Sequence, residues 1–390
     1  MRTQVAIVGA GPAGLMLSHL LHQRGIESVV LEIRSRDYVE QRVRAGVLEQ
    51  GTVDLLTETG LGNRLHKEGI VHHGIELRFG GAGHRIPMTD LTGRSIWIYG
   101  QQKVVEDLIE ARLAAAGAVH FEVSDVSLHD LESDGPYVRF RKDGTEVELH
   151  ADVVAGCDGF HGVSRPSVPG GVLTTYQRDY PFSWLGILAA VAPSTDELIY
   201  AQHERGFALH SLRSPEISRL YLQVAPDDDI ASWPDVRIWD ELHTRFETVD
   251  GWTLHDGPII DKGIAPMRSF VGEPMRYGRL FLAGDAAHIV PPTGAKGLNL
   301  AMADVKVLAE ALTAWYRQGR TDGLDAYSTT CLRRVWRAQH FSWWMTSLLH
   351  TFPDADGYER RLQRSQLDYV VASRSAATSL AENYVGPPPA

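Results

Sequence analysis

The first 32 residues have the pattern of a strand, a glycine-rich turn, a helix and a second strand that ends in an acid. An apolar run at 5–8 leads into the turn Gly9-Ala10-Gly11-Pro12-Ala13-Gly14, and a later apolar run ends at Glu32. In such a turn the first glycine allows the tight bend, the second lets a pyrophosphate approach, and the third lets the helix pack on the strand. The helix N-terminus attracts phosphate charge, and the acid can accept ribose hydroxyls. The pattern predicts a dinucleotide site with contacts at Gly9, Gly11, Ala13, Gly14 and Glu32; a glycine-rich turn that binds nothing is the alternative.

Composition limits the classes of partner and site. The chain has 390 residues, of which 44% are hydrophobic and 22% charged, as is usual for a soluble globular protein with a large core. Its net charge of -11 argues against a nucleic acid or an anionic membrane as partner. Cys157 and Cys331 are the only cysteines, so we predict neither a disulfide framework nor a metal site. The longest other apolar stretch, 184–193, is too short to cross a bilayer, and we expect a cytoplasmic protein.

Changes of pattern along the chain predict its organisation. We expect an α/β fold with a Rossmann-like domain over 1–179, including a small sheet at 74–97, and a return to that domain over 266–300. Strand-like runs at 184–190, 198–201, 206–213 and 219–224, with one helix near 235–247, predict an inserted antiparallel sheet over 180–265. Helical patterns predict helices at 48–65 and 102–116 and a helical region over 301–390, and Asp143-Gly144 predicts a hairpin.

Two more predicted strands end in an acid beside a glycine. Asp158 and Gly159 follow an apolar run at 152–155, and Gly284 and Asp285 follow another at 279–283. A carboxylate at the carboxyl end of a parallel strand can reach ligand hydroxyls in the crevice there. The glycine-rich turn at 291–297 then opens a helix, whose N-terminus would stabilise negative charge on a reduced flavin.

These motifs, in this order, resemble those of the single-component flavoprotein aromatic hydroxylases. Segments 44–51, 156–165, 284–300, 341–346 and 381–386 look like the members of that family that act on 4-hydroxybenzoate, and the likeness runs from Arg2 to Gly386. The resemblance implies tightly bound FAD, with NADPH or NADH and O2 as cosubstrates. It implies hydroxylation of 4-hydroxybenzoate at C3 to 3,4-dihydroxybenzoate by way of a flavin C4a-hydroperoxide.

The resemblance also implies a set of flavin contacts beyond the first turn. It places them at Arg42, Arg44, Ala45, Gly46, Val47, Gln101, Asp158, Asp285, Leu298 and Asn299. From the residues alone, Arg42 and Arg44 would be solvated loop charges.

Binding of the nicotinamide coenzyme is expected on the flavin domain itself. The glycines at 80–83 have neither a strand before them nor a helix after them, so no second dinucleotide domain is predicted. The resemblance implies transient NAD(P)H contacts at Arg34, Tyr38, Phe160, His161, Arg165 and Arg268. Members of the family that prefer NADPH often carry arginine where this chain has Ile33, so the choice between NADPH and NADH stays open.

Two adjacent predicted strands carry polar side chains at period two. Ser211 and Arg213 share one face of the first strand, and Arg219 and Tyr221 share one face of the next. An arginine fork suits a bidentate carboxylate, although a solvated sheet face with a surface salt bridge has the same pattern. The resemblance implies that this face binds the substrate carboxylate, with substrate contacts at Tyr200, Ser211, Leu212, Arg213, Tyr221 and Pro292.

Hydroxylation beside a phenol needs an electron-rich ring, which loss of the phenol proton supplies. A free phenol has a pKa of about 10, so the protein has to favour the phenolate and give its proton an outlet. The resemblance implies that Tyr200 and Tyr384 carry this proton and that His72 is the outlet. The sequence alone does not join these three residues, and packing is the alternative for each tyrosine.

The sequence also bears on the oligomeric state and on alternative functions. The segment 341–345 resembles the dimer-forming region of the family, so we expect a homodimer; an ordinary core helix is the alternative. A related enzyme that acts on another phenolic acid is the second candidate function. A flavin-dependent halogenase would carry a Trp-x-Trp-x-Ile motif, which 182–184 does not supply. A binding protein on this scaffold, like the inhibitors that extract prenylated GTPases, need not hold flavin.

Overall fold

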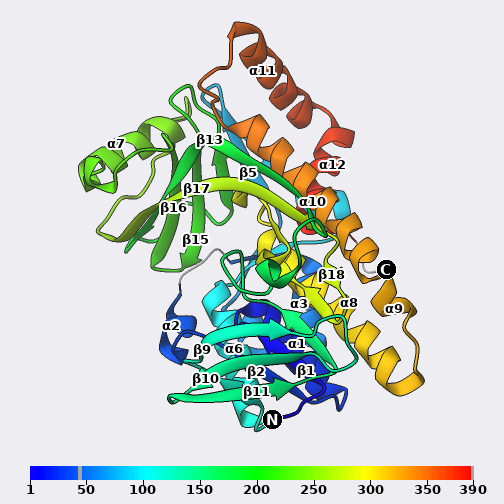
Figure 1. Ribbon diagram of the computed structural model, residues 1–390. Coiled ribbons are helices and arrows are strands. Elements are labelled where there is room, and N and C mark those ends of the chain that lie inside the picture. The colour runs from blue at the N-terminus through cyan, green and yellow to red at the C-terminus, as the bar shows by residue number, and fades with distance from the viewer. Residues whose placement is uncertain (43–45, 388–390) are drawn as a thin grey trace.

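A six-stranded sheet occupies the lower half of the molecule in Figure 1 and carries the first glycine-rich turn. The structure is a computed structural model that describes residues 1–42 and 46–387. The sheet has the order β18-β19-β12-β1-β2-β8, and its neighbours are parallel except for β18 and β19. Its strands are β1 (Val5–Val8), β2 (Ser28–Leu31), β8 (Ala118–His120), β12 (Val153–Gly156), β18 (Arg276–Tyr277) and β19 (Leu280–Leu282). The predicted Rossmann-like fold is confirmed.

Three long helices connect and cover this sheet. Helix α1 (Pro12–Gln23) packs against both α6 (Gln101–Ala114) and α8 (Gly297–Gln318). Parallel strands need long crossover connections, and α1 supplies the one between β1 and β2. Its residues from Ala13 to Leu21 are all buried, because the helix lies between the sheet and its two neighbours. The predicted helix at 102–116 is α6 and is confirmed.

An eight-stranded sheet forms the upper half of Figure 1, in the order β20-β17-β13-β16-β15-β14-β5-β6. All its pairs are antiparallel except β14 with β5. Its strands are β5 (Ile75–Phe79), β6 (Ala82–Ile86), β13 (Thr174–Ala189), β14 (Leu198–Ala201), β15 (Ala208–Ser214), β16 (Ile217–Val224), β17 (Ile259–Glu273) and β20 (His288–Ile289). Helix α7 (Asp235–Phe246) covers one face with a buried apolar cluster. The predicted antiparallel sheet and its helix are confirmed, and β13 and β17 both cross the expected limits at 180 and 265.

Two expectations for the N-terminal half were wrong in detail. The helix expected at 48–65 is a short strand, β3 (Val47–Leu48), followed by two helices, α3 (Gln50–Glu58) and α4 (Gly62–Glu68), because the chain turns at Gly60 with φ of 81°. The segment 74–97 is not one small sheet. Its hairpin β5–β6 joins the eight-stranded sheet, and after α5 (Met88–Thr92) strand β7 (Ile96–Ile98) pairs with β3 and β4 (Ile70–His72). The hairpin at Asp143-Gly144 is confirmed within the sheet of β9 (Ser124–His129), β10 (Tyr137–Lys142) and β11 (Thr145–His150).

The C-terminal region is helical, as expected. Helix α10 (Tyr327–Leu349) runs along the side of the molecule from the lower sheet to the upper one, and α11 (Gly357–Ala372) and α12 (Arg374–Val385) follow it (Figure 1). With the inner face of the upper sheet these helices enclose a second buried apolar cluster. The short elements are α2 (Arg36–Gln41), α9 (Asp322–Asp325), η1 (Arg165–Ser167), η2 (Ile230–Ser232), η3 (Gly284–Ala286) and η4 (Pro292–Gly294). Within 1–42 and 46–387, no helix is long and apolar enough to span a membrane.

Candidate active site

The turn between β1 and α1 leaves room for a ligand at one glycine only. A Cβ on Gly9, whose φ is 103°, would lie 2.4 Å from the carbonyl oxygen of Cys157, and one on Gly14 would lie 2.0 Å from that of Gly9. A Cβ on Gly11 would meet nothing within 4 Å, so the space beside this backbone is open. No side chain caps the helix that begins after Gly11 and includes Ala13. An anion can therefore bind to the free N–H groups of the first turn.

Carboxylates gather at the carboxyl ends of the neighbouring strands. Glu32 follows β2 and accepts hydrogen bonds from the backbone N–H groups of Ala10 at 2.8 Å and Arg34 at 2.9 Å, which hold it beside the turn. Asp158 follows β12, and its Oδ2 accepts from the N–H and hydroxyl of Ser164. Its buried Oδ1 has no partner among the described residues, and burial raises the pKa of this carboxyl. A ligand hydroxyl would satisfy that oxygen.

The second acid–glycine motif lies next to the helix N-terminus expected to face a flavin. Asp285 lies in η3, directly after β19, which pairs with β12. Helix α8 begins at Gly297 without a side-chain cap, so the N–H groups of Leu298 and Asn299 lie in its first turn. The side chain of Asn299 is used within the protein, because it bonds Glu49 N, Thr52 Oγ1, Val47 O and Ala295 O. Only the backbone of Asn299 is left for a cofactor.

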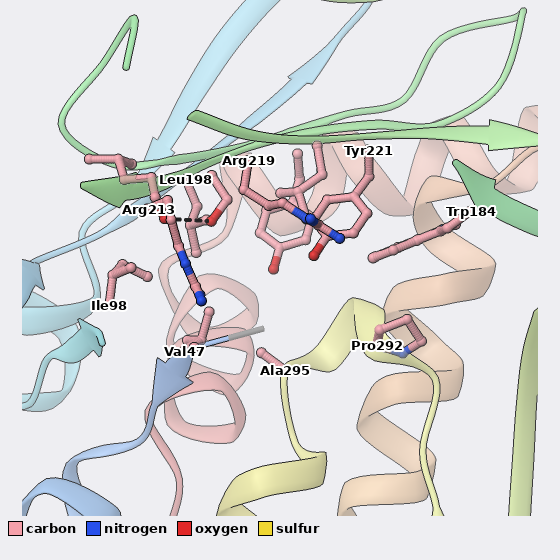
Figure 2. Close-up of a pocket in the computed structure, with 14 residues that line it drawn as sticks. Val47, Ile98, Trp184, Leu198, Arg213, Arg219, Tyr221, Pro292 and Ala295 are labelled. Carbon is pink, nitrogen blue, oxygen red and sulfur yellow. Dashed lines mark hydrogen bonds between the residues drawn. The ribbon is translucent and has the colours of Figure 1, made fainter. Parts of the chain in front are cut away.

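All six predicted substrate residues line one cavity. Figure 2 shows this cavity between the upper sheet and the η4 turn. Its lining residues are Gly46, Val47, Ile98, Trp184, Leu198, Tyr200, Leu209, Ser211, Leu212, Arg213, Arg219, Tyr221, Pro292 and Ala295. Gly46 and Val47, expected as flavin contacts, border the same space.

Two guanidinium groups enter this cavity from adjacent strands. Ser211 on β15 lies directly opposite Arg219 on β16, and Tyr221 follows two residues later on the same face. The guanidinium of Arg213 lies over Gly100, where a Cβ would come within 2.9 Å of its nitrogens. Burial, and then the charge of Arg219, lower the pKa of Arg213. An anion bound between the two arginines would relieve both effects.

The tyrosine pair is assembled from distant parts of the chain. The hydroxyls of Tyr200 on β14 and Tyr384 on α12 hydrogen-bond to each other, and both side chains are at most 2% exposed. Burial raises the pKa of each, so both remain protonated at neutral pH. His72 ends β4 and is fully buried, with neither ring nitrogen bonded to a described residue, and burial lowers its pKa to about 4. No described hydrogen bond links His72 to either tyrosine.

Four of the expected coenzyme residues form one aromatic and cationic cluster. Phe160 makes edge contacts with His161 and Phe270, and the guanidinium of Arg165 lies 4.4 Å from its ring centre and that of Arg268 5.1 Å. Arg34 and Tyr38 form a separate pair, 5.2 Å apart, at the start of α2. Arg42 ends α2, Gln101 begins α6, and Arg44 and Ala45 lie outside the described residues.

Sequence reasoning missed a buried ion pair and an aromatic wall of the site. Lys296, 4% exposed, donates to Glu49 at 2.5 Å and to the carbonyl of Tyr384 at 2.9 Å, and burial lowers its pKa. Trp184 lines the cavity beside Tyr221, with 4.9 Å between ring centres. Nothing in the sequence marks a lone tryptophan in a strand as a cavity residue, and the ion pair joins residues 247 apart.

Comparison with known proteins decides the family. The model of the FAD binding domain family matches residues 2–342, and p-hydroxybenzoate hydroxylase of Acinetobacter baylyi is 50% identical over 389 residues, covering 100% of this chain and 96% of its own. The chain belongs to this family of FAD-dependent aromatic hydroxylases. Rifampicin monooxygenase of Streptomyces venezuelae is 29% identical over 83% of this chain and 67% of its own.

Solved structures of flavin hydroxylases share the fold of this family member. p-Nitrophenol 4-monooxygenase from Pseudomonas putida superposes with a TM-score of 0.81 at 21% identity, over 97% of both chains. At that identity the likeness concerns the fold alone. Together with the family match it confirms the predicted FAD-binding fold with its substrate sheet and helical C-terminal region.

The described residues fit FAD as the cofactor of this enzyme. The open space at Gly11 and the uncapped α1 suit its pyrophosphate, and Glu32 suits a ribose. The unpartnered oxygen of Asp158 suits a hydroxyl, and the uncapped N-terminus of α8 suits negative charge on the flavin ring.

Proposed function

We propose that this enzyme hydroxylates 4-hydroxybenzoate at C3 to give 3,4-dihydroxybenzoate, using NADPH or NADH and O2. The observation that carries the proposal is the composition of the cavity: two arginines and a serine suit a carboxylate, and a buried pair of tyrosine hydroxyls suits a phenol. The relative from Acinetobacter baylyi is named for this substrate. A related phenolic acid is the alternative substrate.

The substrate carboxylate is bound by the polar side chains of β15 and β16. Arg213 offers a planar fork to both oxygens, and Ser211 and Tyr221 add hydroxyl donors from the same sheet face. Arg219 adds a second positive charge. Leu212 and Pro292 contribute cavity wall, and the backbone carbonyl of Pro292 faces the phenol end in this proposal. Charge and shape together select a flat aromatic acid.

The phenol proton leaves through the tyrosine pair. Tyr200 accepts a hydrogen bond from the phenol and passes its own proton to Tyr384, so that the ring gains phenolate character without either tyrosine becoming ionised. His72 is the outlet at the far end, and it passes the proton on toward solvent rather than keeping it. It is neutral at pH 7 because burial lowers its pKa to about 4, and it therefore has a free lone pair. Reorientation or water must bridge His72 and Tyr384.

Bound FAD supplies the reduction and oxygen-transfer chemistry, and the protein places and shields it. The contacts expected at Gly9, Gly11, Ala13, Gly14, Glu32, Gln101, Asp158, Asp285, Leu298 and Asn299 hold the cofactor in this proposal. The N-terminus of α8, which no side chain caps, favours negative charge on the flavin ring. Closure of the cavity by Trp184 and Pro292 limits water, which would otherwise divert turnover to hydrogen peroxide.

Coenzyme binding is proposed at the cluster of Phe160, His161, Arg165 and Arg268, with Arg34 and Tyr38 as a second contact. Aromatic faces suit the nicotinamide or adenine ring, and the guanidinium groups suit phosphates. The cluster lies at residues 160–165 and on β17, whereas Arg34 and Tyr38 lie at the start of α2, so that one extended dinucleotide would have to reach both.

We also propose that the enzyme is a homodimer that uses the exposed face of α10. Trp336 and Trp343 on this helix are 41% and 38% exposed, and Tyr176 beside them is 47% exposed. They line an aromatic groove, whereas Phe341 and Met345 of the same segment lie in the core. Light scattering should give twice the chain mass of 43.2 kDa, and W343E should lower it. A monomeric wild type contradicts the dimer.

Ligand discrimination tests the substrate proposal. We expect 4-hydroxybenzoate to perturb the flavin absorption spectrum with the lowest Kd, benzoate to bind more weakly, and phenol to bind weakest because it leaves the arginines without an anion. Equal binding of phenol and 4-hydroxybenzoate contradicts the assigned carboxylate site. Tighter binding of another phenolic acid favours the alternative substrate.

A further inference from the structure

His350, the residue that follows α10, lies in an aromatic cage beside the candidate cavity. Its side chain is fully buried, and its ring stacks on Phe207 at 4.3 Å and on Phe182 at 4.6 Å between ring centres. The ring of Trp184 lies nearly parallel to it, with 5.8 Å between ring centres. Of these three rings, Trp184 lines the cavity. Packing alone would explain an aromatic ring at this place. It does not explain a histidine, both of whose ring nitrogens form hydrogen bonds.

The two bonds allow one protonation state only. The indole N–H of Trp184 donates to Nε2 of His350 at 2.7 Å, and Nδ1 lies 3.0 Å from the carbonyl oxygen of Thr346. Because an indole N–H can only donate and a carbonyl can only accept, Nε2 accepts and Nδ1 carries the proton. A second proton would occupy Nε2 and break the bond to Trp184. Burial, which lowers the pKa of His350 to about 3, keeps the ring neutral.

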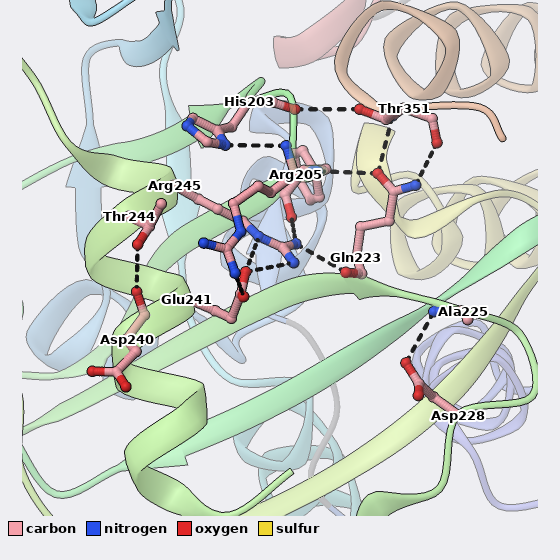
Figure 3. Close-up of polar contacts among 11 residues, drawn as sticks. His203, Arg205, Gln223, Ala225, Asp228, Asp240, Glu241, Thr244, Arg245 and Thr351 are labelled. Atoms are coloured by element: carbon pink, nitrogen blue, oxygen red, sulfur yellow. Dashed lines mark hydrogen bonds and ion pairs between the residues drawn. The ribbon is translucent and has the colours of Figure 1, made fainter. Parts of the chain in front are cut away.

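The next residue attaches to the neighbouring strand in the same way. Gln223 donates from Nε2 to the carbonyl of Thr351 at 2.6 Å, and its Oε1 accepts from the N–H of Thr351 at 3.0 Å (Figure 3). Gln223 on β16 is the direct cross-strand partner of Trp184 on β13. Two consecutive residues at the end of α10 therefore bind two paired residues of the sheet.

The same helix holds another wall of the cavity. Ser342 and Thr346 share one face of α10, His350 follows four residues after Thr346 just beyond the end of the helix, and all three are fully buried. A hydrogen bond of 2.9 Å joins the hydroxyls of Thr346 and Thr293, and a Cβ on Gly294 would lie 2.4 Å from Oγ of Ser342. The η4 turn thus rests on this face, and Figure 2 shows its Pro292 near Trp184.

We propose that His350 is a positioning residue: as a neutral bridge it ties Trp184 to the helix face that also carries the Pro292 turn. The two walls then keep a fixed separation, and the substrate ring is held in one plane. The inference rests on the proposed function. Without the bridge, the indole of Trp184 gains rotameric freedom and the substrate binds more weakly. Water then enters the cavity, and a larger share of the reduced coenzyme yields hydrogen peroxide.

Substitution of His350 tests the bridge in the FAD-loaded enzyme. H350F keeps an aromatic ring but removes the acceptor, and we expect a rise of about fivefold in the Kd for 4-hydroxybenzoate with a larger hydrogen peroxide fraction and unchanged FAD content. H350Q offers an amide oxygen to the indole and should recover part of both losses. Phe182→Leu is the matched control, because it loosens the same cage without touching the bond, and should lower Tm alone.

Two results would overturn the bridge. One is an H350F enzyme with the wild-type Kd and product ratio. The other is a Phe182→Leu enzyme with the same losses as H350F, since packing alone would then account for both.

A substrate-free readout separates this inference from the proposed function. In ¹⁵N-labelled protein, the Trp184 indole N–H should give a slowly exchanging signal that W184F removes and H350F turns into a fast-exchanging one. An unchanged signal in H350F contradicts the bridge whatever the substrate is. Failure of the wild type to bind 4-hydroxybenzoate, with this signal behaving as expected, contradicts the proposed function instead.

Discussion

Burial shifts the pKa of Arg213 and the pKa of Tyr384 in opposite directions. Burial disfavours the charged form of each group, so it lowers the pKa of the Arg213 guanidinium and raises the pKa of the Tyr384 hydroxyl, which stays neutral at pH 7. A bound substrate carboxylate would favour the charged guanidinium and would leave the neutral hydroxyl unchanged. The two side chains therefore suit different tasks, binding of a carboxylate and transfer of a proton.

Arg213→Lys should weaken substrate binding while FAD stays bound. Lysine keeps the charge but loses the planar fork, so we expect the Kd for 4-hydroxybenzoate to rise about tenfold to a hundredfold. Flavin-monitored titration measures it. Arg139→Lys, on the hairpin strand β10 of a different sheet, is the matched control and should bind like the wild type. An unchanged Kd in Arg213→Lys removes this residue from the carboxylate site.

Tyr384→Phe should slow hydroxylation more than it weakens binding. The variant keeps the ring but removes the hydroxyl that bonds Tyr200, so the phenol loses its route for the proton. We expect kcat to fall by about tenfold to a hundredfold, in the range of general acid–base effects, with KM nearly unchanged. Tyr316→Phe, which removes a hydroxyl bonded to Gln4 and Asp152 far from the cavity, is the control. Wild-type coupled turnover in Tyr384→Phe contradicts the proton route.

Helix α10 and the η4 turn show where prediction from sequence ends. The period-two pattern identified Ser211 and Arg213 because a strand places alternate side chains on one face whatever its partner is. The contacts of α10 with Trp184 and Thr293 join residues 166 and 53 apart in the chain, and no local pattern encodes them. The small sheet expected at 74–97 was wrong for the same reason. Strand β5 pairs with β14, which lies far along the chain, and not with β7.

Gly294→Ala tests how closely α10 supports the turn. The added methyl group would overlap Oγ of Ser342, so either the turn or the helix must move. We expect Tm to fall by several degrees and the Kd for 4-hydroxybenzoate to rise. The second change S342A removes that oxygen and should recover part of both losses. Gly357→Ala, where a Cβ meets nothing within 4 Å, is the control. Additive losses in the double variant would contradict this contact.

Across the whole molecule, buried histidines link stability to pH. Burial lowers the pKa of His72 to about 4 and of His210 and His350 to about 3, against about 6.5 in the unfolded chain. Between these values the unfolded chain binds protons that the folded protein does not. The free energy of unfolding is therefore complete above pH 6.5 and falls below it, by about 1.4 kcal/mol per pH unit for each histidine.

Thermal unfolding between pH 4.5 and 8 checks this linkage. We expect Tm to be level above pH 6.5 and to drop below it, and the drop to be shallower in His210→Gln, which removes one such group. The glutamine oxygen can still accept the N–H of Ser194, as the ring does at 3.2 Å. His22→Gln, an exposed position, should follow the wild type. If Tm falls with pH as steeply in His210→Gln as in the wild type, His210 does not contribute to the pH dependence of stability.

One assay shows whether this flavoprotein hydroxylates 4-hydroxybenzoate. NADPH and NADH oxidation by the FAD-loaded enzyme is measured with and without 4-hydroxybenzoate, and 3,4-dihydroxybenzoate and hydrogen peroxide are both quantified. We predict that the substrate stimulates oxidation and that 3,4-dihydroxybenzoate accounts for most of the coenzyme consumed. Stimulated oxidation that yields only peroxide, or no stimulation with either coenzyme, would contradict it.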